Sequence, residues 1–405
     1  RLKKLQINDS SLINTIHLPV TLIKEKFAIK PGTSRQEYEL SVECFDAKYP
    51  LQSLHILVND NPLFGMAGKP VPGNTGRITE TIKIPLSEGP NKIKVYCTNV
   101  HGSASLAEYI EINSSFKPVS PPKTYFIGIA VSNYKDSRMN LQYAAKDVRD
   151  LAMVFGKKYK NFIADTLINQ NATKEKILAL RKKLLQTSVN DKIIISVNGH
   201  GLLDDSLNFY FATWDVNFRS PSTRGLKYEQ LEELLDGIPA RKKLLLIDAC
   251  HSGALDKEEL LEQKKAKEEV KKQRDTSYNN TVRAFAPRGS IIQNKKGLAG
   301  ANSTFELMQN FFTDLSAGNG AVIISAAGGM EYAFESDKWN NGVFTYCVRR
   351  GIEEDLADKE GGNGDNLVDV TELKNYVSRR VFELTNGKQR PVSRRENIDF
   401  NWIVW

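Results

Sequence analysis

The sequence has few cysteines and no long apolar segment. Four cysteines among 405 residues are too few for a fold held together by disulfide bonds. No run approaches the roughly 18 consecutive apolar residues of a membrane-spanning helix, and no charged segment followed by an apolar one resembles a secretion signal. These absences argue against a disulfide scaffold and predict a reduced, cytoplasmic protein without membrane contact.

Signatures of nucleotide and metal binding are also missing. Residues 199–201 lack the third glycine of a dinucleotide-binding loop, and no Walker-type phosphate loop occurs in the sequence. The acidic stretch 355–365 does not have the spacing of an EF-hand calcium loop. We interpret that stretch as a turn before a helix that starts at Thr371, and we expect no nucleotide cofactor.

The excess of positive charge is small. Lys and Arg number 56 and Asp and Glu number 48, which gives a net charge of +8. Basic and acidic residues are interleaved along most of the chain, whereas a nucleic-acid surface would concentrate basic residues. We therefore interpret the charge as a solvated surface and expect no nucleic-acid partner.

The first 115 residues have the pattern of an all-β unit. Short runs of alternating polar and apolar residues are separated by turn sequences rich in Asn, Gly and Pro. We predict a small β-sandwich, immunoglobulin-like in the broad sense, over residues 1–115. Cys44 and Cys97 fall on two of its strands, but no tryptophan lies between them as in antibody domains. We expect two buried free thiols.

A proline-rich connector, residues 116–122, precedes a change of pattern. From residue 123 to 405, apolar strands alternate with segments of helical spacing. The strands are expected at residues 125–131, 192–197, 243–248 and 320–325, and helices at 141–155, 173–186 and 227–235. Because such strands are apolar on both faces, we predict a mostly parallel sheet with helices on both faces, an α/β domain over 123–405.

A long connection interrupts this domain at about residues 256–316. It begins with a highly charged, helix-like run and becomes rich in Asn, Ser and Gly with scattered basic residues. A compact domain rarely accommodates such a connection unless the segment is functional or disordered.

Two strand ends carry residues suited to nucleophilic catalysis. The motif 198–201 is Asn-Gly-His-Gly, and the motif 248–253 is Asp-Ala-Cys-His-Ser-Gly. The carboxyl ends of parallel strands share one edge of a sheet, and ligands bind there. An imidazole near a thiol favours the thiolate and can later protonate a leaving amine. We therefore predict that His200 and Cys250 form a catalytic dyad.

The backbone around the two residues supplies the remaining groups of such a site. The amides of Gly201 and Cys250 are predicted to donate to a developing oxyanion, and the glycines beside His200 would let a substrate approach the backbone. His251 is the alternative base, but as the neighbour of Cys250 it should point away from the thiol. The structural alternative for Cys250 is a buried apolar side chain at a strand end.

The two motifs together resemble those of the caspase-like cysteine peptidases. His200 precedes Cys250 by 50 residues, close to the separation of histidine and cysteine in caspases. Strand-Asn-Gly-His-Gly followed by strand-Asp-Ala-Cys-His-Ser-Gly is most similar to the metacaspase and orthocaspase branch. Further segments resemble that branch in order along the chain, at residues 125–131, 141–147, 208–215, 325–335, 342–346 and 389–391.

The resemblance implies cleavage after Arg or Lys. In the metacaspase branch the aspartate that Asp248 matches and the one that Asp147 matches line the S1 pocket, and Asn198 stands in the same region where the family usually has Ser. Two nearby carboxylates need a compensating cation, which a substrate Arg or Lys supplies. Structural roles stay open: Asp248 as a helix cap, and Asp147 as a charge on a helix face.

The resemblance also bears on cofactors. Many metacaspases need calcium at an acidic cluster that follows the catalytic histidine, but Asn208, Lys227 and Tyr228 occupy regions where several of those acids are expected. We expect no metal or other cofactor, with calcium as the open alternative.

Several expectations concern partners and regulation. We expect protein or peptide substrates with a basic P1 residue, a monomeric enzyme of bacterial signalling or defence, and an activating protein partner for the β-sandwich. The 256–316 connection is expected to act as a zymogen segment that the enzyme cleaves itself. The competing hypothesis is a non-catalytic interaction module.

Overall fold

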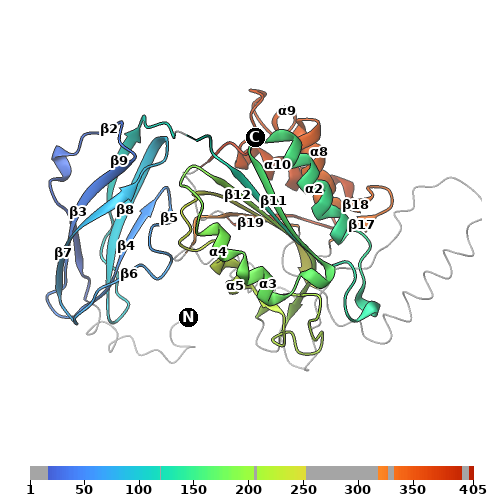
Figure 1. Cartoon of the computed structure of the whole chain (residues 1–405), viewed down its shortest axis with the longest axis horizontal. Coiled ribbons are helices and arrows are strands. Elements are labelled where there is room, and N and C mark those ends of the chain that lie inside the picture. The colour runs from blue at the N-terminus through green and yellow to red at the C-terminus, as the bar shows by residue number, and fades with distance from the viewer. Residues whose placement is uncertain (1–16, 119, 205–207, 252–317, 327–332, 395–400) are drawn as a thin grey trace, which may run out of the picture.

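The chain folds into a β-rich region and an α/β region, which lie side by side in the computed structural model (Figure 1). The structure describes residues 17–118, 120–204, 208–251, 318–326, 333–394 and 401–405. The connection at 256–316 lies outside the described residues, as does most of the 325–335 motif.

Two mainly antiparallel sheets form the β-rich region. The first has the strand order β1 (Val20–Ile23), β3 (Glu37–Phe45), β7 (Arg77–Pro85). The second has the order β2 (Gly32–Thr33), β9 (Glu108–Ser114), β8 (Gly89–Asn99), β4 (Leu51–Val58), β5 (Asn61–Pro62), with β6 (Lys69–Pro70) paired to β4. Alternate apolar residues of both sheets pack into one core, for example Leu40 and Val42 against Ile56 and Ile93. The β-rich region predicted from alternation is confirmed.

The α/β region is built on one mixed sheet. Its main strands follow the order β11 (Phe162–Ile168), β10 (Thr124–Ala130), β12 (Lys192–Leu203), β15 (Lys242–His251), β16 (Val322–Ser325), β19 (Val392–Arg394). The first five are parallel and β19 is antiparallel. At the carboxyl end of β12, the antiparallel strands β13 (Phe209–Phe211) and β14 (Leu226–Lys227) extend the sheet. The mostly parallel sheet is as predicted.

Helices cover both faces of this sheet (Figure 1). One face carries α3 (Lys174–Ala179), α4 (Arg181–Leu184) and α5 (Tyr228–Glu233), and the other carries α2 (Ala144–Lys158), α8 (Val343–Glu353), α9 (Leu356–Lys359) and α10 (Val370–Leu384). Successive strand residues point to opposite faces, so Ile193 and Ile195 pack in one core and Ile194 in the other. This explains why the strands are apolar throughout.

Local chemistry determines where several helices begin and end. The Thr173 hydroxyl accepts from the Lys176 amide and begins α3, which ends before Leu180, so the segment 173–186 forms two short helices instead of the single predicted one. The stretch 355–365 contains the short helix α9 before its turn. There the Asp358 carboxylate accepts from the Gly364 and Asn366 amides at 2.7 and 2.9 Å, so the turn is stabilised by its own backbone.

The β-rich region contacts the α/β region at the amino ends of the central strands. Arg241, directly before β15, is only 4% exposed and donates to Ser87 Oγ at 2.7 Å and to Asn91 Oδ1 at 3.0 Å. Burial lowers the pKa of Arg241 to about 10. The Asp236 carboxylate accepts from the Met66 amide at 2.7 Å. These contacts fix the β-rich region at the edge opposite to the carboxyl ends of the strands.

Candidate active site

Strands β12 and β15 bring the two proposed catalytic residues together. The strands are parallel neighbours, and their register pairs His200 with Cys250 and Asn198 with Asp248. Neighbouring strands are about 4.8 Å apart, so the backbones of His200 and Cys250 are adjacent at the carboxyl edge of the sheet. Apolar residues anchor both strands in the two cores below this edge.

The imidazole of His200 is held by a backbone carbonyl and two aromatic rings. Its Nε2 lies 2.9 Å from the carbonyl oxygen of Met139, and the ring centroids of Tyr134 and Phe218 are 5.2 and 5.9 Å away. A carbonyl only accepts hydrogen bonds, so Nε2 carries the proton and Nδ1 is the basic nitrogen of the neutral ring. This is the tautomer that the predicted role of His200 as a base requires at Nδ1.

Tyr134 also holds the backbone at the histidine. The His200 amide donates to Tyr134 Oη at 2.9 Å. A Cβ at Gly199 would lie 2.8 Å from that oxygen and 3.0 Å from the Phe211 ring. Glycine is therefore required at position 199 by packing inside the protein, where the sequence analysis had assigned it to substrate approach. Gly201 pairs with Phe211 of β13 and with His251 of β15.

Asn198 and Asp248 meet at a third residue that the sequence analysis did not identify. The Thr345 hydroxyl donates to Asp248 Oδ2 at 3.1 Å and accepts from Asn198 Nδ2 at 3.2 Å. Thr345 lies in the first turn of α8, and Asn198, Asp248 and Thr345 are all buried. The positive end of this helix therefore lies close to the Asp248 carboxylate.

Asp147 reaches the same helix from α2. Its Oδ1 accepts from Asn341 Nδ2 at 2.9 Å and from the backbone amide of Gly342 at 3.1 Å. Gly342 directly precedes α8 as its N-cap, and Asp147 is 0% exposed. Asp147 is thus no solvated charge on a helix face, which was one of the two alternatives. All three residues assigned to the S1 pocket contact the start of α8 or the residues directly before it.

A family model described as the caspase domain matches residues 127–401, most of the chain. The chain belongs to the caspase-domain peptidase family. The match confirms the resemblance seen in the sequence and identifies the α/β region as a cysteine-peptidase domain preceded by a β-rich region.

Two solved structures are similar to parts of the chain. A Geobacter sulfurreducens protein is 16% identical, with 69% of this chain and 93% of that chain covered and a TM-score of 0.41. Fibronectin(III)-like modules from Clostridium thermocellum are 15% identical, with 26% of this chain and 51% of that chain covered and a TM-score of 0.19. No curated protein sequence matches the chain. The family assignment rests on the caspase-domain match.

The caspase domain carries additional acids beside Asp147. Glu335 accepts from the amides of Gln142 and Tyr143 at 3.0 and 3.3 Å, and Asp337 accepts from Tyr143 Oη at 2.5 Å. Burial, together with Asp337, Glu335 and Asp147, raises the pKa of Tyr143 to about 12. The segment that precedes α2 is therefore in a negative potential. Glu335 and Asp337 belong to or adjoin the short hairpin of β17 (Glu335–Ser336) and β18 (Asn341–Gly342).

Gln389, which the sequence analysis included among the family-like segments, has a structural role in the caspase domain. Its fully buried side chain donates from Nε2 to the Ala326 carbonyl and accepts at Oε1 from the Phe334 amide, both at 2.8 Å. These two backbone groups flank residues 327–332, which lie outside the described residues. One glutamine side chain thus joins the two ends of that connection.

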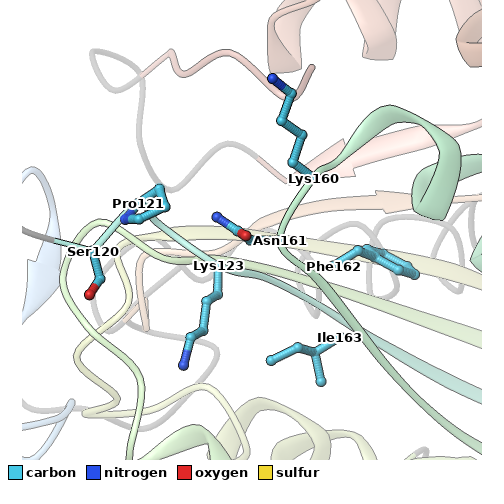
Figure 2. A pocket seen from close by; sticks show the side chains of 7 residues that line it. All are labelled: Ser120, Pro121, Lys123, Lys160, Asn161, Phe162 and Ile163. Atoms are coloured by element: carbon cyan, nitrogen blue, oxygen red, sulfur yellow. The ribbon is translucent and has the colours of Figure 1, made fainter.

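A hollow of about 380 Å³ lies on the caspase domain away from the catalytic motifs (Figure 2). Lys123 directly precedes β10 and Phe162 begins β11, so the hollow is at the amino edge of the sheet. Lys123 and Lys160 extend in opposite directions from it (Figure 2). The hollow and the catalytic motifs are at opposite edges of the sheet, so it is not the peptidase cleft.

The described residues contain neither a metal-ligand cluster nor a membrane-spanning helix. Within these ranges no group of three or more His, Cys, Asp or Glu side chains could hold a metal ion. Asn208, in the region where family members have calcium-binding acids, donates to the Asp204 carboxylate at 2.9 and 3.1 Å. No described helix is both long enough and apolar enough to cross a membrane.

Proposed function

We propose that the protein is a cysteine endopeptidase that cleaves after Arg or Lys with His200 as base and Cys250 as nucleophile. The observation that carries this proposal is the register of β12 and β15, which makes His200 and Cys250 neighbours at the carboxyl edge of the sheet. The Met139 carbonyl supports it, because it keeps the proton of the neutral imidazole on Nε2.

The reaction follows from these groups. His200 Nδ1 takes the thiol proton of Cys250, and the thiolate attacks the scissile carbonyl carbon. The amides of Gly201 and Cys250 donate to the oxyanion of the tetrahedral intermediate. When that intermediate collapses, the C–N bond breaks and the leaving amine takes the proton from the imidazolium. Water, deprotonated by His200, then hydrolyses the thioester. The Met139 carbonyl stabilises the imidazolium at Nε2.

The proposed S1 pocket contains Asp147, Asp248 and Asn198. Two observations support it: the carboxylates are buried, and both contact the start of α8 directly or through Gly342. A carboxylate has about four acceptor positions, so each can accept from a substrate guanidinium in addition to its internal donors. A buried carboxylate strongly favours a paired cation, which explains the preference for Arg or Lys over Asp.

Regulation and localisation belong to the same proposal. The 256–316 connection follows the Cys250 strand closely and contains many Lys and Arg residues, so we expect the enzyme to cleave this segment at basic residues and thereby become active. The β-rich region is the expected docking site of an activating partner, and the enzyme is expected to be a monomeric, cytoplasmic, bacterial signalling or defence peptidase that works without calcium.

A panel of fluorogenic peptides with Arg, Lys, Asp or Leu at P1 tests the reaction. We expect wild type to cleave after Arg and Lys with equal rates in calcium and in EDTA, and Cys250→Ala and His200→Ala to lose at least about 1,000-fold in kcat/KM. His101→Ala, at an exposed histidine of the β-rich region, is the matched control and should retain full activity. If the wild type cleaved no peptide in any condition, the result would favour the non-catalytic interaction module.

The Asp248→Asn variant tests the pocket. Removal of one buried charge should lower kcat/KM for the Arg peptide by about 100-fold and leave the rate of thiol alkylation at Cys250 unchanged. Asp365→Asn, at an exposed position, serves as the control. Efficient cleavage after Asp by the wild type would contradict the S1 assignment.

A further inference from the structure

Two cysteines outside the catalytic motifs face each other in the β-rich region. Cys44 lies on β3 and Cys97 on β8, in opposite sheets, and both are free and 0% exposed. Each thiol is the largest influence on the pKa of the other. The sequence analysis predicted two buried free thiols, and the structure confirms this.

One residue of a third strand, β1, lies near both sulfur atoms. The Thr21 hydroxyl on β1 lies 3.2 Å from Cys97 Sγ and 3.6 Å from Cys44 Sγ. Cys97 Sγ is also 3.8 Å from the Val20 carbonyl. The two sheets therefore approach closely at this level of the core, which is a condition for a bond between cysteines of different sheets.

The groups around the pair shift the pKa values of the two thiols in opposite directions. The interaction with Cys44 is the main cause that lowers the pKa of Cys97 to about 7, and Thr21 and Ser105 add to it against the effect of burial. The same interaction and burial raise the pKa of Cys44. Ser105 Oγ accepts from the Cys97 amide at 3.1 Å and lies 2.8 Å from Thr21 Oγ1. Cys97 is thus the more acidic thiol of the pair and the one expected to react first.

We propose that Cys44 and Cys97 are a redox modification site, which closes to an inter-sheet disulfide by exchange with a small disulfide such as oxidised glutathione. The Cys97 thiolate attacks one sulfur of glutathione disulfide, whose S–S bond breaks and releases one glutathione thiolate. Cys44 loses its proton and attacks the Cys97 sulfur of the mixed disulfide, which releases the second glutathione. Two protein thiols are oxidised by two electrons, and one glutathione disulfide is reduced to two thiols.

The disulfide should stabilise the β-rich region without altering the catalytic edge. It would close a long loop between β3 and β8, and such a crosslink raises the melting temperature of a domain of this size by roughly 10 °C or more. Because both thiols are buried, the exchange needs a local opening of the core, and it should proceed faster during refolding than in the folded protein.

The test uses the full chain with Cys250→Ala, so that the catalytic thiol does not react. One sample is incubated folded with oxidised glutathione, and a second is refolded from urea in a glutathione redox buffer. Free thiols are then alkylated in denaturant and the peptides are identified by mass spectrometry. We expect a Cys44–Cys97 linked peptide, with Cys347 alkylated, and a rise in melting temperature that dithiothreitol reverses. The same protein with Cys44→Ala or Cys97→Ala should show no rise.

A linked peptide in both samples, or in the refolded sample alone, supports the proposal. Alkylation of both Cys44 and Cys97 in the refolded sample would overturn it, as would a linked peptide without any change in melting temperature. Because the Cys250→Ala protein is used throughout, the result does not depend on the peptidase reaction.

Discussion

Met139 contributes only a backbone carbonyl to the candidate active site, yet that oxygen decides which nitrogen of His200 carries the proton. Tyr134 adds a phenol oxygen that accepts from the His200 amide and a ring that packs beside the imidazole. Each of these contacts restricts the orientation of one side chain. The orientation of His200 therefore depends on residues outside the predicted dyad.

Tyr134→Phe isolates the contribution of one hydrogen bond. The ring remains beside His200, but the buried His200 amide loses its acceptor, a loss that typically costs about 1–3 kcal/mol. We expect kcat to fall by roughly 3- to 10-fold with little change in KM, because the base is displaced while the pocket is intact. Steady-state kinetics measure both constants. Tyr109→Phe, at an exposed tyrosine, is the control, and an unchanged kcat would refute the positioning role.

Lys192 makes the stability of the protein depend on pH. Burial and the neighbouring charge of Lys242, its register partner, lower the pKa of Lys192 to about 8. An unfolded lysine has a pKa near 10.4, so between about pH 8 and pH 10 the unfolded state binds more protons, and the free energy of unfolding rises with pH.

Lys192→Met removes this dependence. We expect the free energy of unfolding of wild type, relative to the variant, to rise by about 1–2 kcal/mol between pH 7 and pH 10. Urea denaturation at constant ionic strength measures it. Lys182→Met, at an exposed lysine, should show no such rise, and a constant difference between wild type and Lys192→Met would contradict the shifted pKa.

At the scale of elements, sequence patterns predicted the strands but did not predict the side-chain contacts that hold strands and helices together. Asn198 and Asp248 could be assigned to one edge because each follows an apolar strand. Thr345, which bonds both, is 97 residues from Asp248 in the chain. Thr345 reaches Asn198 and Asp248 only because α8 packs on the sheet. The hydrophobic periodicity of a single segment does not predict how a helix packs on distant strands. The burial of Asp147 was missed for the same reason, because it depends on Asn341 and Gly342 from a distant hairpin.

The contribution of the Gln389 side chain to the free energy of unfolding can be measured by its removal. Gln389→Ala leaves the Ala326 carbonyl and the Phe334 amide without their partner and opens a small cavity. We expect the free energy of unfolding to fall by about 2–4 kcal/mol, measured by urea denaturation. Gln36→Ala, at an exposed glutamine of the β-rich region, should change it by less than about 0.5 kcal/mol. Equal stability of the two variants would show that the hydrogen bonds of Gln389 contribute nothing.

At the scale of the whole molecule, the β-rich region and the catalytic motifs lie at opposite ends of the same strands. Arg241 begins the segment that leads through β15 to Cys250, and the distance along this strand is roughly 30 Å. Arg241 contacts Ser87 in a loop and Asn91 on β8, and Asp236 contacts Met66 in a loop of the β-rich region. The two regions therefore form a docked pair, and the docking contacts lie at the amino edge of the sheet, away from the catalytic motifs.

Arg241→Met tests whether this docking couples the folding of the two regions. Methionine retains much of the length of the side chain but removes the donors to Ser87 and Asn91, which then lie in the interface without that partner. The cost should be about 2–4 kcal/mol. We expect wild type to unfold in urea in one transition and the variant in two, both followed by circular dichroism. All four tryptophans, at positions 214, 339, 402 and 405, lie in the α/β region, so tryptophan fluorescence identifies the transition of that region. Because the interface is far from Cys250, the kcat of the variant in the absence of urea should equal that of wild type.

Arg219→Met, at an exposed arginine, is the control and should unfold as wild type does. Superimposable transitions for Arg241→Met and wild type would mean that the two regions are held together by other contacts, and that Arg241 is buried without coupling them.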